Sequence, residues 1–173
     1  MKTKAVTNAG DSTADKIKLA LSTSFYLGLA PVAPGTFGTL GGVVLAVLLG
    51  ATGGYFFLAL ILALTVLYVG GRWLGDWAEQ RAAGKDPQFF VVDEVLGYLI
   101  AIAWFAPPSA LTLVVGFALF RLFDVTKPPP AKRLERLGGG DGIMLDDAIA
   151  GVYAFLCLAL LRAVVLDPSA WVR

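Results

Sequence analysis

The sequence predicts an all-α polytopic membrane bundle of about five short membrane helices, since a helix that spans a bilayer needs roughly 20 apolar residues. Of the 173 residues, 57% are hydrophobic and only 16% are charged, whereas soluble domains contain about 25% charged residues. The stretches 36–71 and 95–120 contain no charged residue, and 148–166 contains only Arg162. No stretch alternates polar and apolar residues as a membrane-spanning strand would.

Glycine and proline divide the two longer apolar stretches into helices. The glycines and threonine of Gly50–Gly54 form the expected turn in the first stretch, because glycine favours turns over helix interiors. Pro107-Pro108-Ser109 interrupts the second stretch, since proline cannot donate a backbone hydrogen bond. Residues 1–18 are polar and are expected to be a disordered N-terminus, and residues 19–173 are expected to form a single helical domain.

Nearly all the charge lies in the segments 1–35, 72–94 and 121–147, which hold 12 of the 14 basic and 12 of the 13 acidic residues. If each apolar stretch between them is a hairpin, all three segments emerge on one face of the membrane. Cytoplasmic loops carry the excess of Lys and Arg in membrane proteins. We therefore expect these polar loops to face the cytoplasm.

The composition also excludes several kinds of chemistry. A net charge of +1 argues against nucleic-acid binding, which needs a surplus of basic residues. The single cysteine, Cys157, excludes an internal disulfide and a cysteine-based zinc site. The chain has no histidine, which removes Ser-His-Asp triads and histidine-based metal sites. The remaining chemistry uses carboxylates, Lys, Arg, hydroxyls and the backbone.

Two polar motifs lie where apolar helices are expected to begin. Thr36 or Thr39 could cap the helix that follows Pro34-Gly35, and a helix start of this kind also favours an anion. Asp93-Glu94 opens the charge-free stretch 95–120. An acidic pair there either compensates the helix dipole or holds a cation, and the motif alone leaves both readings open.

The third polar segment carries further candidates. Arg121, Asp124 and Lys127 are spaced to share one helix face, either as a surface ion-pair network or as ligands. The glycines of 138–142 predict a loop that can approach a ligand closely. Asp146-Asp147 is expected to open the last membrane helix, as Asp93-Glu94 opens an earlier one.

Together these motifs predict a metal-dependent site for phosphoryl transfer at the membrane surface. Oxygen ligands without His or Cys are those that Mg²⁺ prefers, and Arg and Lys suit phosphate oxygens. Ionisable residues at membrane helices are functional candidates. The carboxylates that meet the same interface are Asp93, Glu94, Asp124, Asp146 and Asp147.

Four stretches in the same order, 28–40, 86–97, 120–130 and 138–151, resemble the phosphatidylglycerophosphatase A family. They read GLAPVAPGTFGTL, DPQFFVVDEVLG, FRLFDVTKPPP and GGGDGIMLDDAIAG. The resemblance implies a multi-pass enzyme of the bacterial inner membrane that hydrolyses phosphatidylglycerophosphate to phosphatidylglycerol and phosphate, for phosphatidylglycerol and cardiolipin synthesis. It also implies Mg²⁺ as cofactor and the same five carboxylates as catalytic and metal-binding residues.

Our hypothesis is that these carboxylates hold one or two Mg²⁺ ions against the terminal phosphate. Arg121 and Lys127 would bind its oxygens, with Thr36 or Thr39 assisting. An Asp-x-Asp signature is absent because Thr126 is the second residue after Asp124, which favours attack by water over a phospho-enzyme. The alternatives are a CDP-alcohol phosphotransferase-like enzyme, whose motif spacing fails after Asp141-Gly142, and a small cation transporter, whose site would lie near the membrane midplane.

Overall fold

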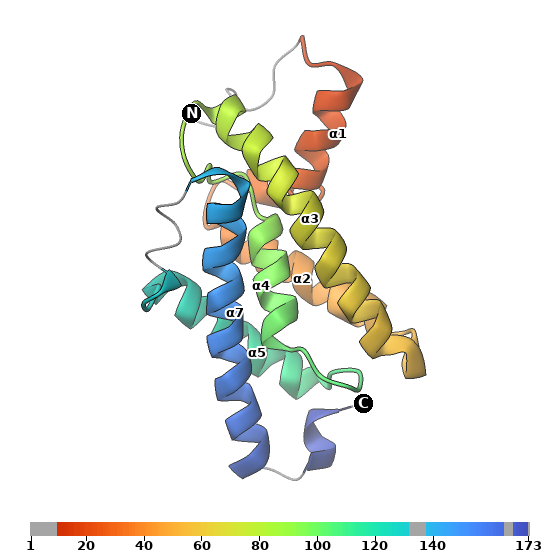
Figure 1. The fold of residues 1–173 in the computed structure, drawn as a ribbon. Helices are drawn as coiled ribbons and strands as arrows, with labels where there is room; N and C mark the ends of the chain where they lie inside the picture. Colours follow the sequence, from red (N-terminus) through yellow and green to blue (C-terminus); the bar gives the residue numbers. More distant parts are fainter. Residues whose placement is uncertain (1–9, 132–137, 165–167, 173) are drawn as a thin grey trace.

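The computed structural model describes residues 10–131, 138–164 and 168–172. The described residues form helices and turns, with a single isolated bridge between Pro108 and Val172 in place of any strand, so the all-α prediction is confirmed. The α-helices (Figure 1) are α1 (Thr13–Ser22), α2 (Pro34–Gly50), α3 (Phe56–Ala82), α4 (Val92–Ala101), α5 (Ala110–Thr126) and α7 (Gly139–Val164). Short 3₁₀ turns occupy Leu27–Leu29, Gly53–Tyr55 and Pro168–Trp171.

The short helix α4 lies at the centre of the bundle and is contacted by α2, α3, α5 and α7 (Figure 1). Nearly all its residues are buried, including Tyr98 and Leu99. Tyr98 is the largest fully buried side chain, and its hydroxyl donates a hydrogen bond of 3.0 Å to the carbonyl of Leu113 in α5. A buried hydroxyl needs such a partner, and this one ties α4 to α5.

Small residues let neighbouring helices approach α4 closely. A Cβ at Gly38 of α2 would lie 2.6 Å from the Cβ of Val91, and one at Gly42 would lie 2.9 Å from the ring of Tyr98. On the other side, Gly97 of α4 faces Gly151 of α7. Close helix contact through small residues is common in membrane bundles, and here it fixes how far apart the polar ends of the helices lie.

The glycine and proline breaks are confirmed. The first apolar stretch is divided at Gly50, where α2 ends, and α3 begins at Phe56. The second is divided at the prolines, between the end of α4 and Ala110 of α5. Ser109 caps α5 by accepting a hydrogen bond of 3.3 Å from the N–H of Thr112, as serine commonly does at this position.

Two helices are long and apolar enough to cross a membrane, spanning Gly53–Ala82 and Gly139–Val164, and Pro34–Gly50 is a shorter apolar helix. Only 11% of the most apolar window of the first is buried, so it is not the core helix of a soluble protein. An apolar groove of about 540 Å³ also runs between α1, α2 and α3. These exposed apolar surfaces suit a lipid environment.

The polar N-terminus is helical from Thr13, and its first nine residues lie outside the described part of the chain. The ammonium of Lys18 lies 5.0 Å from the ring centre of Trp73 in α3. Arg81 of α3 forms an ion pair of 2.6 Å with Asp11. A cation over an aromatic face and a largely buried ion pair are both favourable here, so they hold α1 against the polar end of α3.

Candidate metal centre and phosphate site

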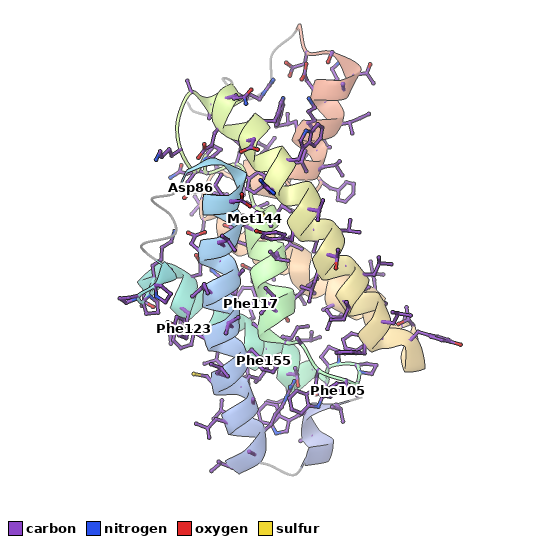
Figure 2. All side chains as sticks on the ribbon, viewed as in Figure 1. Asp86, Phe105, Phe117, Phe123, Met144 and Phe155 are labelled. Atoms are coloured by element: carbon purple, nitrogen blue, oxygen red, sulfur yellow. The ribbon has the colours of Figure 1, made fainter. Side chains whose placement is uncertain are left out.

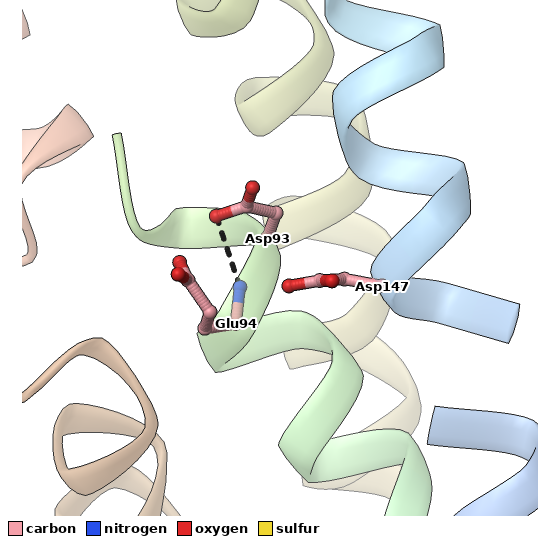
Figure 3. Close-up of side chains that lie close together, drawn as sticks. All are labelled: Asp93, Glu94 and Asp147. Atoms are coloured by element: carbon pink, nitrogen blue, oxygen red, sulfur yellow. Dashed lines mark hydrogen bonds between the residues drawn. The ribbon is translucent and has the colours of Figure 1, made fainter. Parts of the chain in front are cut away.

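Three carboxylates meet between α4 and α7. Asp93, Glu94 and Asp147 each offer an oxygen atom, and these atoms lie within 4.8 Å of one another. Figure 3 shows Asp147 reaching from α7 toward the first turn of α4, where Asp93 and Glu94 are adjacent. Like charges so close together repel each other unless protons or a cation joins them. We refer to these three residues as the acidic centre.

The acidic centre is shielded from water. Asp93 and Asp147 are buried, and the Oε2 atom of Glu94 is buried without a hydrogen-bond partner among the described residues. Burial raises the pKa of both Asp93 and Glu94, which precede the apolar part of α4, and nearby acidic groups raise each pKa further. An unpartnered buried oxygen points to a missing ion or water. The donor set is therefore suited to a divalent cation with hard oxygen ligands.

The backbone at the start of α4 fixes the orientation of Asp93. Its carboxylate accepts a hydrogen bond of 3.0 Å from the N–H of Glu94, drawn as the dashed line in Figure 3. Asp146 accepts the N–H of Asp147 in the same way, also at 3.0 Å. Negative charge in the first turn of α4 is also favoured by the helix dipole, which lowers the cost of placing two acids there.

An arginine lies beside the acidic centre. The guanidinium of Arg121 in α5 forms an ion pair with Asp124 and donates a long hydrogen bond of 3.4 Å to the hydroxyl of Thr39. A Cβ at Gly35 would overlap the carboxylate of Glu94 and lie 3.1 Å from Nη1 of Arg121. The first turn of α2, the acid Glu94 and the guanidinium of Arg121 therefore share one small space.

Asp124 and Lys127 connect α5 to the acids of α7. The carboxyl groups of Asp124 and Asp147 lie close enough to repel each other when both are charged. The ammonium of Lys127 lies 2.7 Å from Oδ2 of Asp146. Arg121, Asp124 and Lys127 thus face the acids, as their helical spacing predicts, and Lys127 pairs with Asp146 of α7.

Two expectations about helix starts were wrong. Asp146 and Asp147 do not open the last helix, because α7 begins at Gly139. Thr36 and Thr39 do not cap α2, which begins at Pro34 after Ala33; the hydroxyl of Thr39 instead donates 2.9 Å to the carbonyl of Gly35. No side-chain hydrogen bond joins Thr36 to the acidic centre in the part of the chain that the structure describes.

The early start of α7 has a cause in α3. Asp76 accepts a hydrogen bond of 2.7 Å from the N–H of Gly140, and Glu79 accepts one of 2.9 Å from Gly139. These carboxylates satisfy N–H groups that a helix start leaves unpaired. The glycines are therefore not a ligand-binding loop: a Cβ at Gly140 would overlap the carbonyl of Arg72, so they allow α7 to approach α3.

Sequence reasoning did not identify Asp76 and Glu79 as the partners of α7. Their spacing of three residues places them on one face of α3. Two acids on one helix face, in a chain that also has a glycine-rich segment at 138–140, are the one sequence signal that could have suggested the pairing. Cross-helix capping of this kind depends on the tertiary fold, so the signal does not name the partner.

The fold and the site together define a class: a membrane-associated, all-helical protein with a buried acidic centre flanked by Arg121 and Lys127. The chain belongs to the phosphatidylglycerophosphatase A family, whose sequence profile it matches over residues 20–162. It is 36% identical to phosphatidylglycerophosphatase A of Haemophilus influenzae, with 79% of this chain and 83% of the relative covered.

Two further relatives extend this comparison. Phosphatidylglycerophosphatase A of Escherichia coli is 32% identical, with 76% of each chain covered. A putative phosphatidylinositol-3-phosphatase of Bacteroides thetaiotaomicron is 35% identical, with 86% of this chain and 96% of the relative covered. No solved structure matches the fold.

Proposed function

We propose that this chain is a Mg²⁺-dependent lipid phosphatase that hydrolyses phosphatidylglycerophosphate to phosphatidylglycerol and phosphate. Family membership and two relatives named phosphatidylglycerophosphatase A support the reaction. The observation that carries the proposal is the acidic centre beside Arg121, because grouped carboxylates next to a guanidinium suit a metal ion and a phosphate monoester.

Asp93, Glu94 and Asp147 are the residues that would hold the metal. The unpartnered Oε2 of Glu94 and the all-oxygen donor set support this fit. Mg²⁺ bound there would neutralise charge on the phosphate and the acids. Asp124, which interacts with both Asp147 and Arg121, would orient these two groups, and Asp146 would hold Lys127 in place through their ion pair.

The phosphate itself would be bound by Arg121 and Lys127. A guanidinium presents paired N–H donors that match two phosphate oxygens. Asp124 and Thr39 both contact Nη1 of Arg121 and hold the guanidinium beside Gly35. Lys127 would contribute a point charge. Thr39 would act through Arg121, and Thr36 would complete the polar first turn of α2.

The setting would be the inner membrane, with several membrane-crossing helices and the acidic centre near the cytoplasmic face. Charge sorting in the sequence and the two long apolar helices support this arrangement. A lipid substrate would then reach the acidic centre laterally while its acyl chains stay among apolar helix surfaces.

A second candidate substrate is phosphatidylinositol 3-phosphate. The relative from Bacteroides thetaiotaomicron supports it, since that protein is named for this substrate and 96% of its length is covered. Both lipids present a phosphate monoester on a glycerophospholipid headgroup, so the acidic centre and Arg121 suit either one. The surroundings of the headgroup would decide between them.

The test is phosphate release by the purified full-length chain from phosphatidylglycerophosphate, phosphatidylinositol 3-phosphate and phosphatidic acid, each with and without Mg²⁺. We expect the first lipid to be the best substrate and turnover to require Mg²⁺. The control is Asp141→Asn, a carboxylate on α7 that is ion-paired with Arg72 outside the acidic centre. Preference for the inositol lipid would select the second candidate, and Mg²⁺-independent turnover would contradict the metal assignment.

A further inference from the structure

A second polar site lies at the far end of α7. Arg162 is on the same helix as Asp147 but about four turns further along, roughly 22 Å away at 1.5 Å per residue. Its side chain is buried, with a relative exposure of 7%. Figure 2 shows the separation of the two ends: Met144 of α7 lies toward one end of the bundle, and Phe155 and Phe105 lie toward the other.

Aromatic rings and one hydroxyl surround the guanidinium of Arg162. It lies 4.4 Å from the ring centre of Trp104, which in turn contacts Phe105 and Phe155. Nη2 is 3.5 Å from the hydroxyl of Thr112. A cation over an indole face is a favourable contact, yet the indole ring carries no formal negative charge to neutralise the guanidinium.

Three hydrogen-bond donors in this region have no acceptor among the described residues. They are Nε and Nη1 of Arg162 and Nε1 of Trp171, and all are buried. Thr112 connects them, because it receives Nη2 of Arg162 and donates 2.5 Å to the carbonyl of Trp171. No ion pair involves Arg162 in the described part of the chain. Buried donors without acceptors indicate a missing anion or water.

The charge makes an anion the better choice. Arginine cannot be deprotonated in proteins, and a buried charge without a partner is strongly unfavourable. The acidic centre is too distant to neutralise it. Two donors of one guanidinium, together with an indole N–H, match the several oxygens of a single phosphate group.

We propose that Arg162, Thr112 and Trp171 form a binding site for the phosphate of a membrane phospholipid, separate from the acidic centre. The neighbouring surface favours a lipid over a free ion. Phe105, Leu160 and Val164 are exposed apolar side chains at the same end of the bundle, and they offer acyl chains a surface beside the phosphate. The site is a means of holding a structural or regulatory lipid.

Entry of the phosphate requires a local movement. The turn Pro168–Trp171, which carries the Trp171 donor, is held to the start of α5. Ser109 donates 2.7 Å to the carbonyl of Ala170, and its N–H donates 3.3 Å to that of Trp171. A shift of this turn breaks these bonds, the one from Thr112 and the bridge between Pro108 and Val172. The donors of Ser109 and Thr112 that it frees can then bind phosphate oxygens.

The experiment counts bound lipids on the full-length chain in detergent by native mass spectrometry. The probes are dioctanoyl phosphatidylglycerol, dioctanoylglycerol, which lacks the phosphate, and inorganic phosphate. The variants are Arg162→Met, Trp171→Phe, which removes only the N–H donor, and the charge-matched control Arg72→Met. Arg72 is an exposed arginine near the start of α7.

We expect the wild type and Arg72→Met each to bind one more phosphatidylglycerol than Arg162→Met. Binding at this site should be at least about tenfold weaker in Arg162→Met. Trp171→Phe should show a smaller loss of affinity. Dioctanoylglycerol should not distinguish the variants. Equal lipid binding by Arg162→Met overturns the proposal, as does displacement of the lipid by millimolar inorganic phosphate, which would mean a site for the free ion. Thermal unfolding of Arg162→Met without lipid, expected at or above the wild-type temperature, checks that it folds.

Discussion

Gly97 of α4 and Gly151 of α7 meet through their backbones. A Cβ added to Gly151 would overlap the carbonyl oxygen of Gly97, and one added to Gly97 would lie 2.6 Å from the carbonyl oxygen of Asp147. The contact lies within one turn of the acidic residues on both helices. It therefore sets the separation across which Asp147 reaches Asp93 and Glu94.

Replacement of Gly151 by Ala should separate α4 from α7 at this point. We expect thermal unfolding in detergent to show a loss of about 1–3 kcal/mol, the usual cost of overpacking, together with weaker Mg²⁺ binding. Gly70→Ala is the matched control, because a Cβ there meets nothing within 4 Å and Ala favours helix over Gly. Equal Mg²⁺ affinity in the two variants would mean that the glycine contact does not position the acidic centre.

A methyl group at Gly35 should act on the site more than on the fold. It would overlap the carboxylate of Glu94 and crowd the guanidinium of Arg121. Both groups are the ends of flexible side chains, which can shift without unfolding the helix. We expect Gly35→Ala to lose activity by about tenfold or more, since small displacements of positioning groups are costly, with little change in unfolding temperature. Steady-state kinetics of Gly35→Ala, with Gly70→Ala measured in parallel as the control, checks this. Equal activity of the two variants would exclude Gly35 from the site.

Arg121→Lys keeps the charge but removes the planar pair of donors. Lysine cannot contact Thr39, Asp124 and a phosphate in the same arrangement, since its single ammonium is a point charge. We expect kcat/KM to fall roughly 10- to 100-fold, the range for losing hydrogen bonds to charged groups. Near-normal turnover of Arg121→Lys would mean that a positive charge at this position is sufficient. The paired N–H donors of the guanidinium would then not be required for turnover.

The helix breaks and most of the site residues were predictable from local sequence. Glycine at 50–54 ends α2, and proline at 107–108 lies in the break between α4 and α5, through backbone chemistry that needs no tertiary information. The acidic pair Asp93-Glu94 was recognised because it precedes a charge-free stretch, and it does lie in the first turn of α4. These features depend on neighbours in the chain.

The remaining features depend on contacts between distant segments. The helix α7 begins further upstream than the sequence predicts, because Asp76 and Glu79 of α3 accept hydrogen bonds from its first N–H groups. The pair Asp146-Asp147 divides because successive helix residues point about 100° apart: Asp146 meets Lys127, whereas Asp147 joins the acidic centre. The sequence motif contains both acids but not the rotation of α7 that separates them.

Mg²⁺ should stabilise the fold, and Asp147 should be required for that effect. A cation that binds only the folded chain adds about 2.7 kcal/mol at 100 times its Kd, so chelation by EDTA should lower the unfolding temperature of the wild type. Asp147→Asn removes one of the three oxygen ligands and is expected to unfold at the same temperature with or without EDTA. Its phosphate release should fall on the order of 100-fold or more, since a metal ligand is worth several kcal/mol.

The control for this prediction is Asp141→Asn, which changes a carboxylate on the same helix that is ion-paired with Arg72. Because Asp141 lies outside the acidic centre, this variant should keep the EDTA-dependent shift and the wild-type turnover. Isothermal titration with Mg²⁺ separates the two variants directly, with heat expected from Asp141→Asn and none from Asp147→Asn at the same concentrations. An unchanged EDTA response in Asp147→Asn would move the metal away from the α4–α7 contact, because no other described group of three carboxylates is arranged to hold it.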